Sequence, residues 1–333
     1  MINVAIKKSF KDSKTFKYEF HSSSQRIVLF GPSGSGKTNL IKMIAGFLKP
    51  DEGIIEVNGK IFFKKNEKNL PIYKRNIGYL PQEYTLFPHM TVEENILYGV
   101  KIKNIKLNKK FYLNLLEKFN LFSKLNYYPN QLSGGEKQRV AFVRAILTNP
   151  NLFLFDEPFS SLDKAIKEKL RDAVIDILDE FSTKAIFVTH DFEDAFILGK
   201  EVFIIYNGQI IERGTADKIF NHPEYLETAK MVNFKNIFKV NEFAKIVKKE
   251  IKISQKFLGI KPENITFEKS NNSIPIKVKL KSLKKIGLIY EYTFLTENNK
   301  KLISISPELK NSEKVYVNLN SLVPLKELEN ENF

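Results

Sequence analysis

The chain is 333 residues long, with 43% hydrophobic and 27% charged residues, which is ordinary for a soluble globular protein with room for two domains. It has no cysteine, which excludes disulfides and cysteine-ligated metals. No run of apolar residues approaches the ~20 needed to cross a bilayer, and the start of the chain does not have the layout of a secretion signal. We therefore expect a cytosolic protein. The formal net charge of +15 comes from basic residues scattered along the chain rather than gathered on one arm, which predicts only a weak attraction to phosphate-rich surfaces such as lipid headgroups, and no nucleic-acid partner.

The first part of the chain alternates predicted strands and helices. Residues 26–30 are a short apolar run that predicts a buried strand, and residues 37–47 carry apolar side chains at helical spacing. Residues 152–155 and 185–188 predict two central parallel strands, and residues 164–181 between them have helical spacing. This alternation predicts an α/β fold.

Turns and helix starts are marked by short polar signals. Asn-Gly pairs at residues 58–59 and 207–208 stand between β-rich flanks and predict hairpin turns, because Asn and Gly tolerate positive φ. Residues 91–147 are predicted to be mostly helical. Two pairs there fit the capping box that starts a helix: Thr91 with Glu94, and Ser133 with Glu136.

Beyond about residue 220 the pattern changes to short β-type runs separated by polar turns. Examples of such runs are residues 274–280, 302–305 and 314–319. We therefore predict an α/β domain over residues 1–230, with a helical subdomain at about 85–147, followed by a small all-β, barrel-like domain over residues 235–330.

A glycine-rich loop joins the first buried strand to a helix and matches the P-loop pattern. Its glycines let backbone N–H groups face a phosphate, and the helix adds its positive end. Lys37 would reach the outer phosphates, and the Thr38 hydroxyl would ligate Mg²⁺. The predicted phosphate-binding residues are Gly31, Pro32, Ser33, Gly34, Ser35, Gly36, Lys37 and Thr38.

Two acidic residues follow the apolar strand at residues 152–155. The carboxyl end of a strand borders the crevice where α/β sheets bind ligands. We expect Asp156 to hold Mg²⁺ and Glu157 to polarise the attacking water. His190 ends the next predicted strand, which would bring it to the same edge of the sheet.

The segment from Leu132 to Arg139 offers a second anion-binding device. Ser133, the unobstructed amides of Gly134 and Gly135, and the helix that starts beside Glu136 resemble a phosphate cradle. A glycine loop that merely caps an amphipathic helix has the same features. If one P-loop binds one nucleotide, we expect this second anion-binding segment to contact a nucleotide held by another subunit.

In this order, the four motifs resemble those of the ATP-binding subunits of ABC transporters over about residues 1–230, and residues 132–136 correspond to the family signature. The resemblance implies that Gln82 is a catalytic glutamine that senses the γ-phosphate and a ligand of Mg²⁺, and that His190 is the switch histidine. It implies an interface loop at Ser161, Leu162 and Asp163, with Ser161 where Ala is common. It also implies that Phe10 stacks on adenine, with Phe16 as the competitor and core packing as the alternative for either.

The C-terminal part extends the resemblance to importers. Residues 259–265, Gly-Ile-Lys-Pro-Glu-Asn-Ile, are similar to a segment of the oligonucleotide-fold-like (TOBE/MOP-like) regulatory domains appended to importer ATPases. Importers with such domains carry molybdate, tungstate, sulfate, iron, polyamines or sugars. Residues 82–99 look closest to the molybdate/tungstate and related oxyanion group.

The resemblance implies an assembly on the cytoplasmic face of the cell membrane. Two copies would form a homodimer around two ATP molecules with Mg²⁺, and would move two transmembrane permease subunits through a groove near Tyr84, Leu86 and Phe87. An extracytoplasmic solute-binding protein would be an indirect partner. A DNA-repair-type ABC ATPase is the rival reading, but the interval between Lys37 and Ser133 lacks the heptad repeat typical of that class.

Overall fold

The computed structural model describes residues 1–10, 14–83, 85–160 and 162–328, which group into two compact units, Met1–Ala216 and Asp217–Phe333. The strands of the first unit are β1 (Ile2–Ser9), β2 (Thr15–Ser22), β3 (Arg26–Phe30), β4 (Glu52–Val57), β5 (Lys60–Lys64), β6 (Lys68–Asn69), β7 (Ile77–Leu80), β8 (Leu152–Asp156), β9 (Lys184–Thr189), β10 (Glu201–Tyr206) and β11 (Gln209–Gly214). Its helices are α1 (Lys37–Ala45), α2 (Val92–Ile102), α3 (Lys109–Lys118), α4 (Gly134–Ile146), α5 (Lys164–Glu180) and α6 (Phe192–Leu198).

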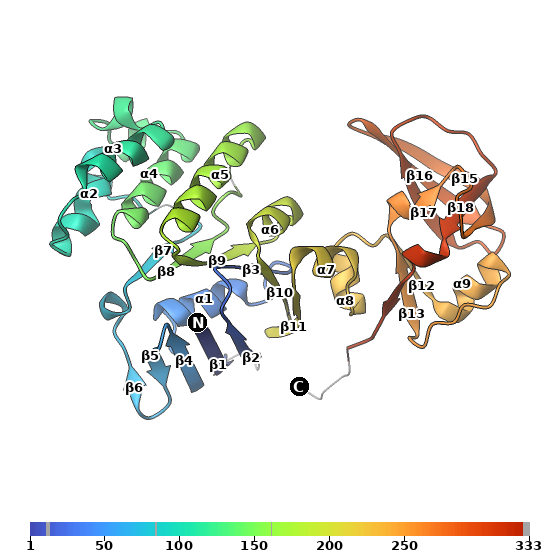
Figure 1. Ribbon diagram of the computed structural model, residues 1–333, viewed down its shortest axis with the longest axis horizontal. Helices are drawn as coiled ribbons and strands as arrows, with labels where there is room; N and C mark the ends of the chain where they lie inside the picture. The colour runs from blue at the N-terminus through green and yellow to red at the C-terminus, as the bar shows by residue number, and fades with distance from the viewer. Residues whose placement is uncertain (11–13, 84, 161, 329–333) are drawn as a thin grey trace. The chain divides into compact units, whose positions relative to one another are not determined.

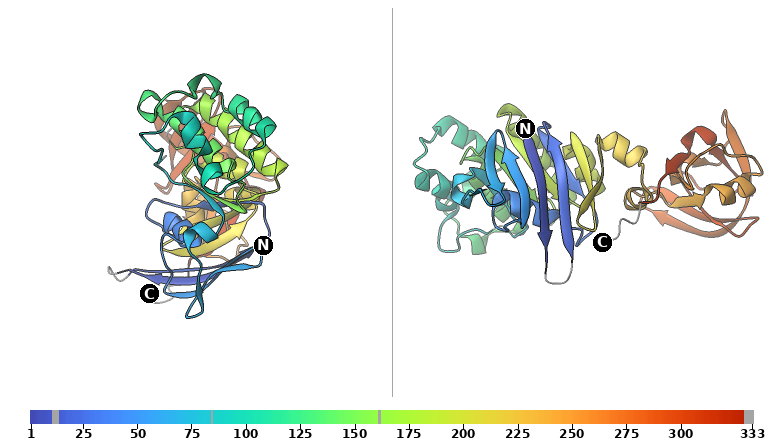
Figure 2. Two further views of the ribbon diagram at one scale, coloured as in Figure 1. Left: turned by 90° about the vertical axis from the view of Figure 1, so that its left-hand side faces the viewer. Right: turned by 90° about the horizontal axis from the view of Figure 1, so that it is seen from below.

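The described strands of the first unit form one mixed eleven-stranded sheet in the order β6-β5-β4-β1-β2-β11-β10-β3-β9-β8-β7. The strands from β10 to β7 are parallel, and those from β6 to β2 are antiparallel. The dark and mid-blue strands of the antiparallel half lie side by side in Figure 2, right. The parallel half confirms the predicted α/β fold and sets the carboxyl ends of β3, β8 and β9 next to one another.

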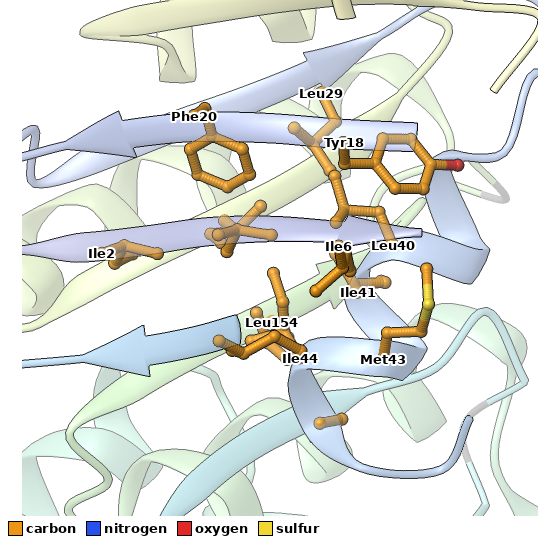
Figure 3. Close-up of a cluster of buried hydrophobic side chains, with 14 of the residues drawn as sticks. Ile2, Ile6, Tyr18, Phe20, Leu29, Leu40, Ile41, Met43, Ile44 and Leu154 are labelled. Atoms are coloured by element: carbon orange, nitrogen blue, oxygen red, sulfur yellow. The ribbon is translucent and has the colours of Figure 1, made fainter. Parts of the chain in front are cut away.

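Helix α1 packs between the two halves of this sheet. Its buried side chains Leu40, Ile41 and Ile44 meet residues of β1 and β2 on one side and of β3 and β8 on the other (Figure 3). Because α1 begins at the end of the glycine-rich loop, this core fixes the loop against the sheet.

Helices α2, α3 and α4 lie together beside β7 and β8 (Figure 1) and make up the helical subdomain that the sequence predicts. Thr91 and Ser133 cap α2 and α4 through the expected reciprocal bonds with Glu94 and Glu136. Both predicted capping boxes are therefore confirmed.

In the described residues, the second unit contains a β barrel, a small separate sheet and three short helices. Its helices are α7 (Ala216–Asn221), α8 (Leu226–Met231) and α9 (Val240–Val247), and its strands are β12 (Asn236–Lys239), β13 (Phe257–Ile260), β14 (Ile265–Thr266), β15 (Ser273–Ile286), β16 (Ile289–Thr296), β17 (Lys301–Ser306), β18 (Lys314–Asn318) and β19 (Val323–Leu325).

Five of these strands form a nearly closed antiparallel barrel in the order β14-β18-β15-β16-β17. The Ser304 hydroxyl on β17 donates to the Ile265 carbonyl on β14 at 2.5 Å and links the two ends of the order. Strands β12, β13 and β19 form a separate small sheet.

The division of the chain falls at Ala216, earlier than the boundary near residue 230 expected from the sequence. Backbone bonds explain why the intervening residues group with the second unit: the Leu226 amide donates to the Lys326 carbonyl at 2.9 Å, and the Lys326 amide donates to the Glu224 carbonyl at 2.8 Å. Helix α9 also interrupts the run of strands that the sequence predicts there.

Candidate active site

The glycine-rich loop is anchored from two neighbouring elements of the sheet. The Tyr18 hydroxyl on β2 donates to the Gly36 carbonyl at 2.9 Å, and the Gly208 amide donates to the Ser35 carbonyl at 2.9 Å. Gly36 has φ +107°, and a Cβ there would lie 2.2 Å from the Tyr18 oxygen. Position 36 therefore requires glycine on both conformational and steric grounds.

Lys37 lies inside the loop with 5% of its surface exposed. Its Nζ donates to the carbonyls of Gly31 and Pro32 at 2.7 and 2.8 Å. Burial lowers the pKa of Lys37, while the carboxylates of Glu157 and Asp156 act in the opposite direction. A cation held this way, partly stripped of water, attracts an anion more strongly than an exposed lysine does.

Asp156 and Thr38 meet where β8 ends beside the start of α1. The Thr38 hydroxyl donates to Asp156 Oδ1 at 2.9 Å, and the Tyr79 hydroxyl lies 3.5 Å from Asp156 Oδ2. Asp156 is 5% exposed, and burial raises its pKa, with the neighbouring Glu157 carboxylate adding to the rise. A buried carboxylate beside a second one favours a nearby cation.

Glu157 and His190 come together across β8 and β9. His190 Nδ1 lies 3.0 Å from Glu157 Oε1, and the Glu157 amide donates to the Val188 carbonyl at 3.0 Å. Glu157 has φ +49°, a left-handed conformation that is uncommon for a residue with a side chain. Such backbone outliers concentrate at functional sites, because the surrounding structure must hold them in place.

The signature segment begins helix α4. Ser133 is the N-cap: its backbone amide donates to Glu136 Oε2 at 2.8 Å, and its hydroxyl accepts from the Glu136 amide at 3.3 Å. A Cβ on Gly135 would lie 3.1 Å from Leu162 Cδ2, so the signature packs against the predicted interface loop of the same chain. Asp163 is the N-cap of α5, and Ser161 lies outside the described residues.

Gln82 is exposed just after β7, whose Leu80 pairs with Phe155 on β8. Among the described residues, no hydrogen bond joins Gln82 to the Thr38–Asp156 pair. The sheet therefore places Gln82 two residues beyond the end of β7, at the same edge as Asp156, without a hydrogen bond to the Thr38–Asp156 pair.

The segment after Gln82 is held by two side chains of the helical subdomain. The Phe87 amide donates to Asn95 Oδ1 at 2.8 Å, the Arg144 guanidinium lies 5.4 Å from the centre of the Phe87 ring, and Arg144 Nη1 donates to the Thr85 carbonyl at 3.0 Å. Tyr84, part of the same predicted groove, lies outside the described residues.

Phe10 and Phe16 differ in their surroundings. Phe16 is 8% exposed and belongs to the core, and a Cβ on Gly208 would lie 2.2 Å from its ring. Phe10 is only partly buried at the end of the β1–β2 hairpin, with its ring 5.2 Å from that of Phe16. Phe10 thus has ring surface to offer a ligand, whereas Phe16 is used in packing.

Comparison with known proteins identifies the family of this chain. Residues 18–160 match the model of the family described as ABC transporter. A molybdate/tungstate import ATP-binding protein of Pyrococcus horikoshii is 34% identical over 304 residues, with 87% of each chain covered. A spermidine/putrescine import ATP-binding protein of Acetivibrio thermocellus is 34% identical over 334 residues, covering 95% of this chain and 92% of that one. The chain belongs to the ABC transporter ATP-binding proteins.

A solved ATP-binding cassette, a dimer in a post-hydrolysis state bound to ADP and Pi, matches with a TM-score of 0.57 and 26% identity, covering 65% of this chain and 99% of that chain. Our ABC protein is thus an ATP-binding ATPase subunit of an importer, with a C-terminal β domain. None of its described helices is both long and apolar enough to span a membrane.

Sequence reasoning missed some residues of this ABC site. Tyr18 contacts the glycine-rich loop, and Tyr79 contacts the Asp156 carboxylate. The alternation of Phe16, Tyr18 and Phe20 with polar residues is the signal that would have predicted β2. The basic residues Lys167 and Arg171, which contact the helix after His190, carried no signal beyond helical spacing.

Proposed function

We propose that the chain hydrolyses ATP at composite sites formed by two copies and thereby powers the import of an oxyanion of the molybdate, tungstate or sulfate group. The observation that carries the catalytic part is the convergence of Thr38–Asp156 and Glu157–His190 at the carboxyl ends of β8 and β9. Phosphate binding, metal binding and activation of water all require groups at that one edge.

Binding of ATP is assigned to the loop from Gly31 to Thr38. Lys37 would exchange its bonds with the loop carbonyls for bonds with the outer phosphates, and Gly34, with φ +78° and open space around it, permits close approach of the backbone. The Ser35 hydroxyl is buried and has no partner among the described residues, so it also suits a polar ligand. Phe10 would stack on adenine.

The residues at the end of β8 fit Mg²⁺. The Thr38 hydroxyl and the Asp156 carboxylate are hard oxygen donors 2.9 Å apart, and the buried Asp156 carboxylate favours a cation. Thr38, Asp156 and Gln82 would hold the ion, which when bound would neutralise charge on the phosphate oxygens.

Glu157 orients and polarises the attacking water, and His190 contacts the γ-phosphate while its ring pairs with Glu157. The backbone leaves the extended conformation of β8 at Glu157, where φ is positive, and the 3.0 Å contact with His190 Nδ1 holds the Glu157 carboxylate. Both groups act by positioning and by complementing charge, which dominate phosphoryl transfer.

The second half of each site would come from another copy. Ser133, Gly134 and Gly135 lie at the N-terminus of α4, which carries a partial positive charge, and Leu162 packs beside Gly135. The dimer of the related cassette bound to ADP and Pi supports this assembly. Two permease subunits would dock near Leu86 and Phe87, which places the protein on the cytoplasmic face of the membrane, with a solute-binding protein as indirect partner.

An oxyanion is proposed as the substrate from the likeness to molybdate/tungstate importers together with the likeness of residues 82–99. A sulfate/thiosulfate import protein of Mesostigma viride is also 34% identical, over 317 residues, with 90% of each chain covered. A polyamine is the second candidate, because the spermidine/putrescine relative is as similar and covers more of this chain.

The test uses the importer assembled with its permease and solute-binding subunits in liposomes. We expect ATP-dependent uptake of labelled molybdate or sulfate, competed by tungstate, and none in a Glu157→Gln assembly. Uptake of labelled spermidine that oxyanions do not compete with would overturn the oxyanion assignment and leave the ATPase assignment standing.

A further inference from the structure

Helices α5 and α6 are joined by a cluster of ion pairs next to the proposed catalytic residues. Lys167 Nζ on α5 lies 2.9 Å from Asp191 Oδ2 and 2.9 Å from Asp194 Oδ2. Arg171, one turn further along α5, contacts Asp194 Oδ1 at 3.2 Å and Glu193 Oε1 at 3.4 Å. We call Lys167, Arg171, Asp191 and Asp194 the α5–α6 clamp.

Most of the clamp is buried, unlike an ordinary surface ion pair, and only Asp191, with a side chain that is 43% exposed, lies at its rim. The side chains of Arg171 and Asp194 are 5% and 4% exposed, and that of Lys167 is 14% exposed. Burying charges is expensive even when they are paired, and apolar residues of similar size often stabilise a fold as well or better. Stability alone therefore gives a poor account of the clamp, and the fixed geometry of its ionic contacts gives a better one.

The clamp holds both chain neighbours of His190. Asp191 follows His190 directly, its amide donates to the Thr189 hydroxyl at 3.0 Å, and its Oδ1 accepts from the Asp194 amide at 3.0 Å. Asp191 is thus the N-cap of α6 and at the same time the partner of Lys167. The His190 side chain is 54% exposed, so its place beside Glu157 depends on this support of its backbone.

The other end of the clamp leads to the interface loop. Helix α5 begins at Lys164, immediately after Leu162 and Asp163, and Leu162 packs against Gly135 of the signature segment. One continuous helix therefore joins the loop beside the signature to the residues that hold His190.

We propose that Lys167 and Arg171 are positioning residues that, through Asp191 and Asp194, hold the His190 ring against Glu157. The position of α5 then sets whether the Glu157–His190 pair is formed. This inference depends on the proposed roles of Glu157 and His190 in ATP hydrolysis.

The first experiment measures steady-state ATP hydrolysis by the full chain with Lys167→Met. We expect kcat to fall about tenfold or more while KM for ATP stays within about twofold, because small misplacement of a catalytic group slows chemistry and the P-loop is untouched. Lys167→Arg should restore most of the rate. Lys169→Met, at an exposed position on the same helix, is the matched control and should match the wild-type rate.

A double-mutant comparison separates positioning from general stability. If Lys167 acts through His190, adding Lys167→Met to a His190→Ala chain should lower kcat by less than about twofold more. An equal additional loss in that background would overturn the proposal. Asp191→Asn keeps a good N-cap residue and removes the ionic partner of Lys167, so it repeats the test if Lys167→Met fails to fold.

The outcomes also separate this inference from the proposed function. If His190→Ala hydrolyses ATP at the wild-type rate, the role of His190 fails. If His190→Ala hydrolyses ATP slowly but Lys167→Met and Asp191→Asn hydrolyse it at the wild-type rate, only the positioning role of the clamp is overturned.

Discussion

The first unit, which holds the catalytic edge, and the second unit, which holds the barrel, differ in whether charged side chains are buried. Among the described residues, the charged side chains that are buried all lie in the first unit: Arg26, Lys37, Arg75, Asp156, Arg171, Asp194 and Glu212. The buried polar residues of the second unit are neutral: Thr228, Asn236, Thr293, Thr296, Ser304 and Ser306. The second unit keeps its charges in more exposed Lys–Glu pairs such as Lys248–Glu297 and Lys300–Glu242.

The difference matters because an ionised group is costly to remove from water. Lys37 and Asp156 are both buried at the sheet edge. A bound phosphate would offset the cost of removing Lys37 from water, and a bound cation would offset that cost for Asp156. The barrel has no comparable buried charge among its described residues, so substitutions there should change stability, while those at the edge should change chemistry.

Glu157→Gln should have the largest effect on chemistry. Removing the group that polarises water is expected to lower kcat for ATP by about 10²- to 10⁴-fold, while the amide keeps the shape of the side chain. ATP binding should persist and trap a dimer, which size-exclusion chromatography with ATP would detect. Turnover near the wild-type rate would remove Glu157 from its role.

Lys37→Ala should come next, as a loss of binding. A hydrogen bond to a charged group contributes about 1.5–3 kcal/mol, so we expect ATP affinity to fall about 10- to 150-fold. Titration with a fluorescent ATP analogue measures it. Lys49→Ala, at an exposed position beyond the end of α1, is the control and should bind normally; an unchanged affinity in Lys37→Ala would contradict the phosphate role of Lys37.

Local signals were enough to predict much of the first unit from the sequence. The hairpin turn at Asn58-Gly59 has φ +50° and +77°, as an Asn-Gly turn requires, and strand β3 begins and ends at the predicted residues. The capping box at Ser133 needs only residues three apart in the chain. These features depend on neighbouring residues alone, so the sequence contains them fully.

Features that depend on packing between distant elements could not be predicted. The positive φ of Glu157 depends on how the end of β8 packs beside β9. The clamp requires the charged side chains of α5 to lie opposite those of α6. In the barrel, residues 274–280 were expected as a short strand, whereas β15 extends to Ile286 and turns at Gly287. Residues 281–286, Lys-Ser-Leu-Lys-Lys-Ile, do not alternate apolar and polar side chains, so they give no sign that the hairpin continues.

Asn236→Ala tests the second unit's side of the comparison, at the contact between the small sheet and barrel strand β17. The Ile303 amide donates to Asn236 Oδ1 at 2.6 Å, and Asn236 Nδ2 donates to the Ile303 carbonyl at 2.8 Å, with Asn236 1% exposed. Truncation leaves a buried amide unpaired, so we expect unfolding free energy to fall by about 1–3 kcal/mol with ATP hydrolysis unchanged below the transition. Urea unfolding measures it, with exposed Asn271→Ala as control; slow hydrolysis with intact stability would break the comparison.

Asp51→Asn should have the smallest effect, because it removes a partly exposed pair. Lys8 Nζ lies 2.8 Å from Asp51 Oδ1, and this bond, with that from the Ser9 amide, holds the pKa of Asp51 below its ordinary value. A depressed pKa adds stability above the ordinary pKa that is lost as pH falls through the folded value. We expect Asp51→Asn to cost about 0.2–1 kcal/mol at pH 7 and progressively less as the pH falls below the ordinary pKa of aspartate, by urea unfolding. A loss of unfolding free energy that does not depend on pH would assign the effect to the hydrogen bonds. A loss as large as that of Asn236→Ala would contradict the distinction between exposed and buried polar groups on which the comparison depends.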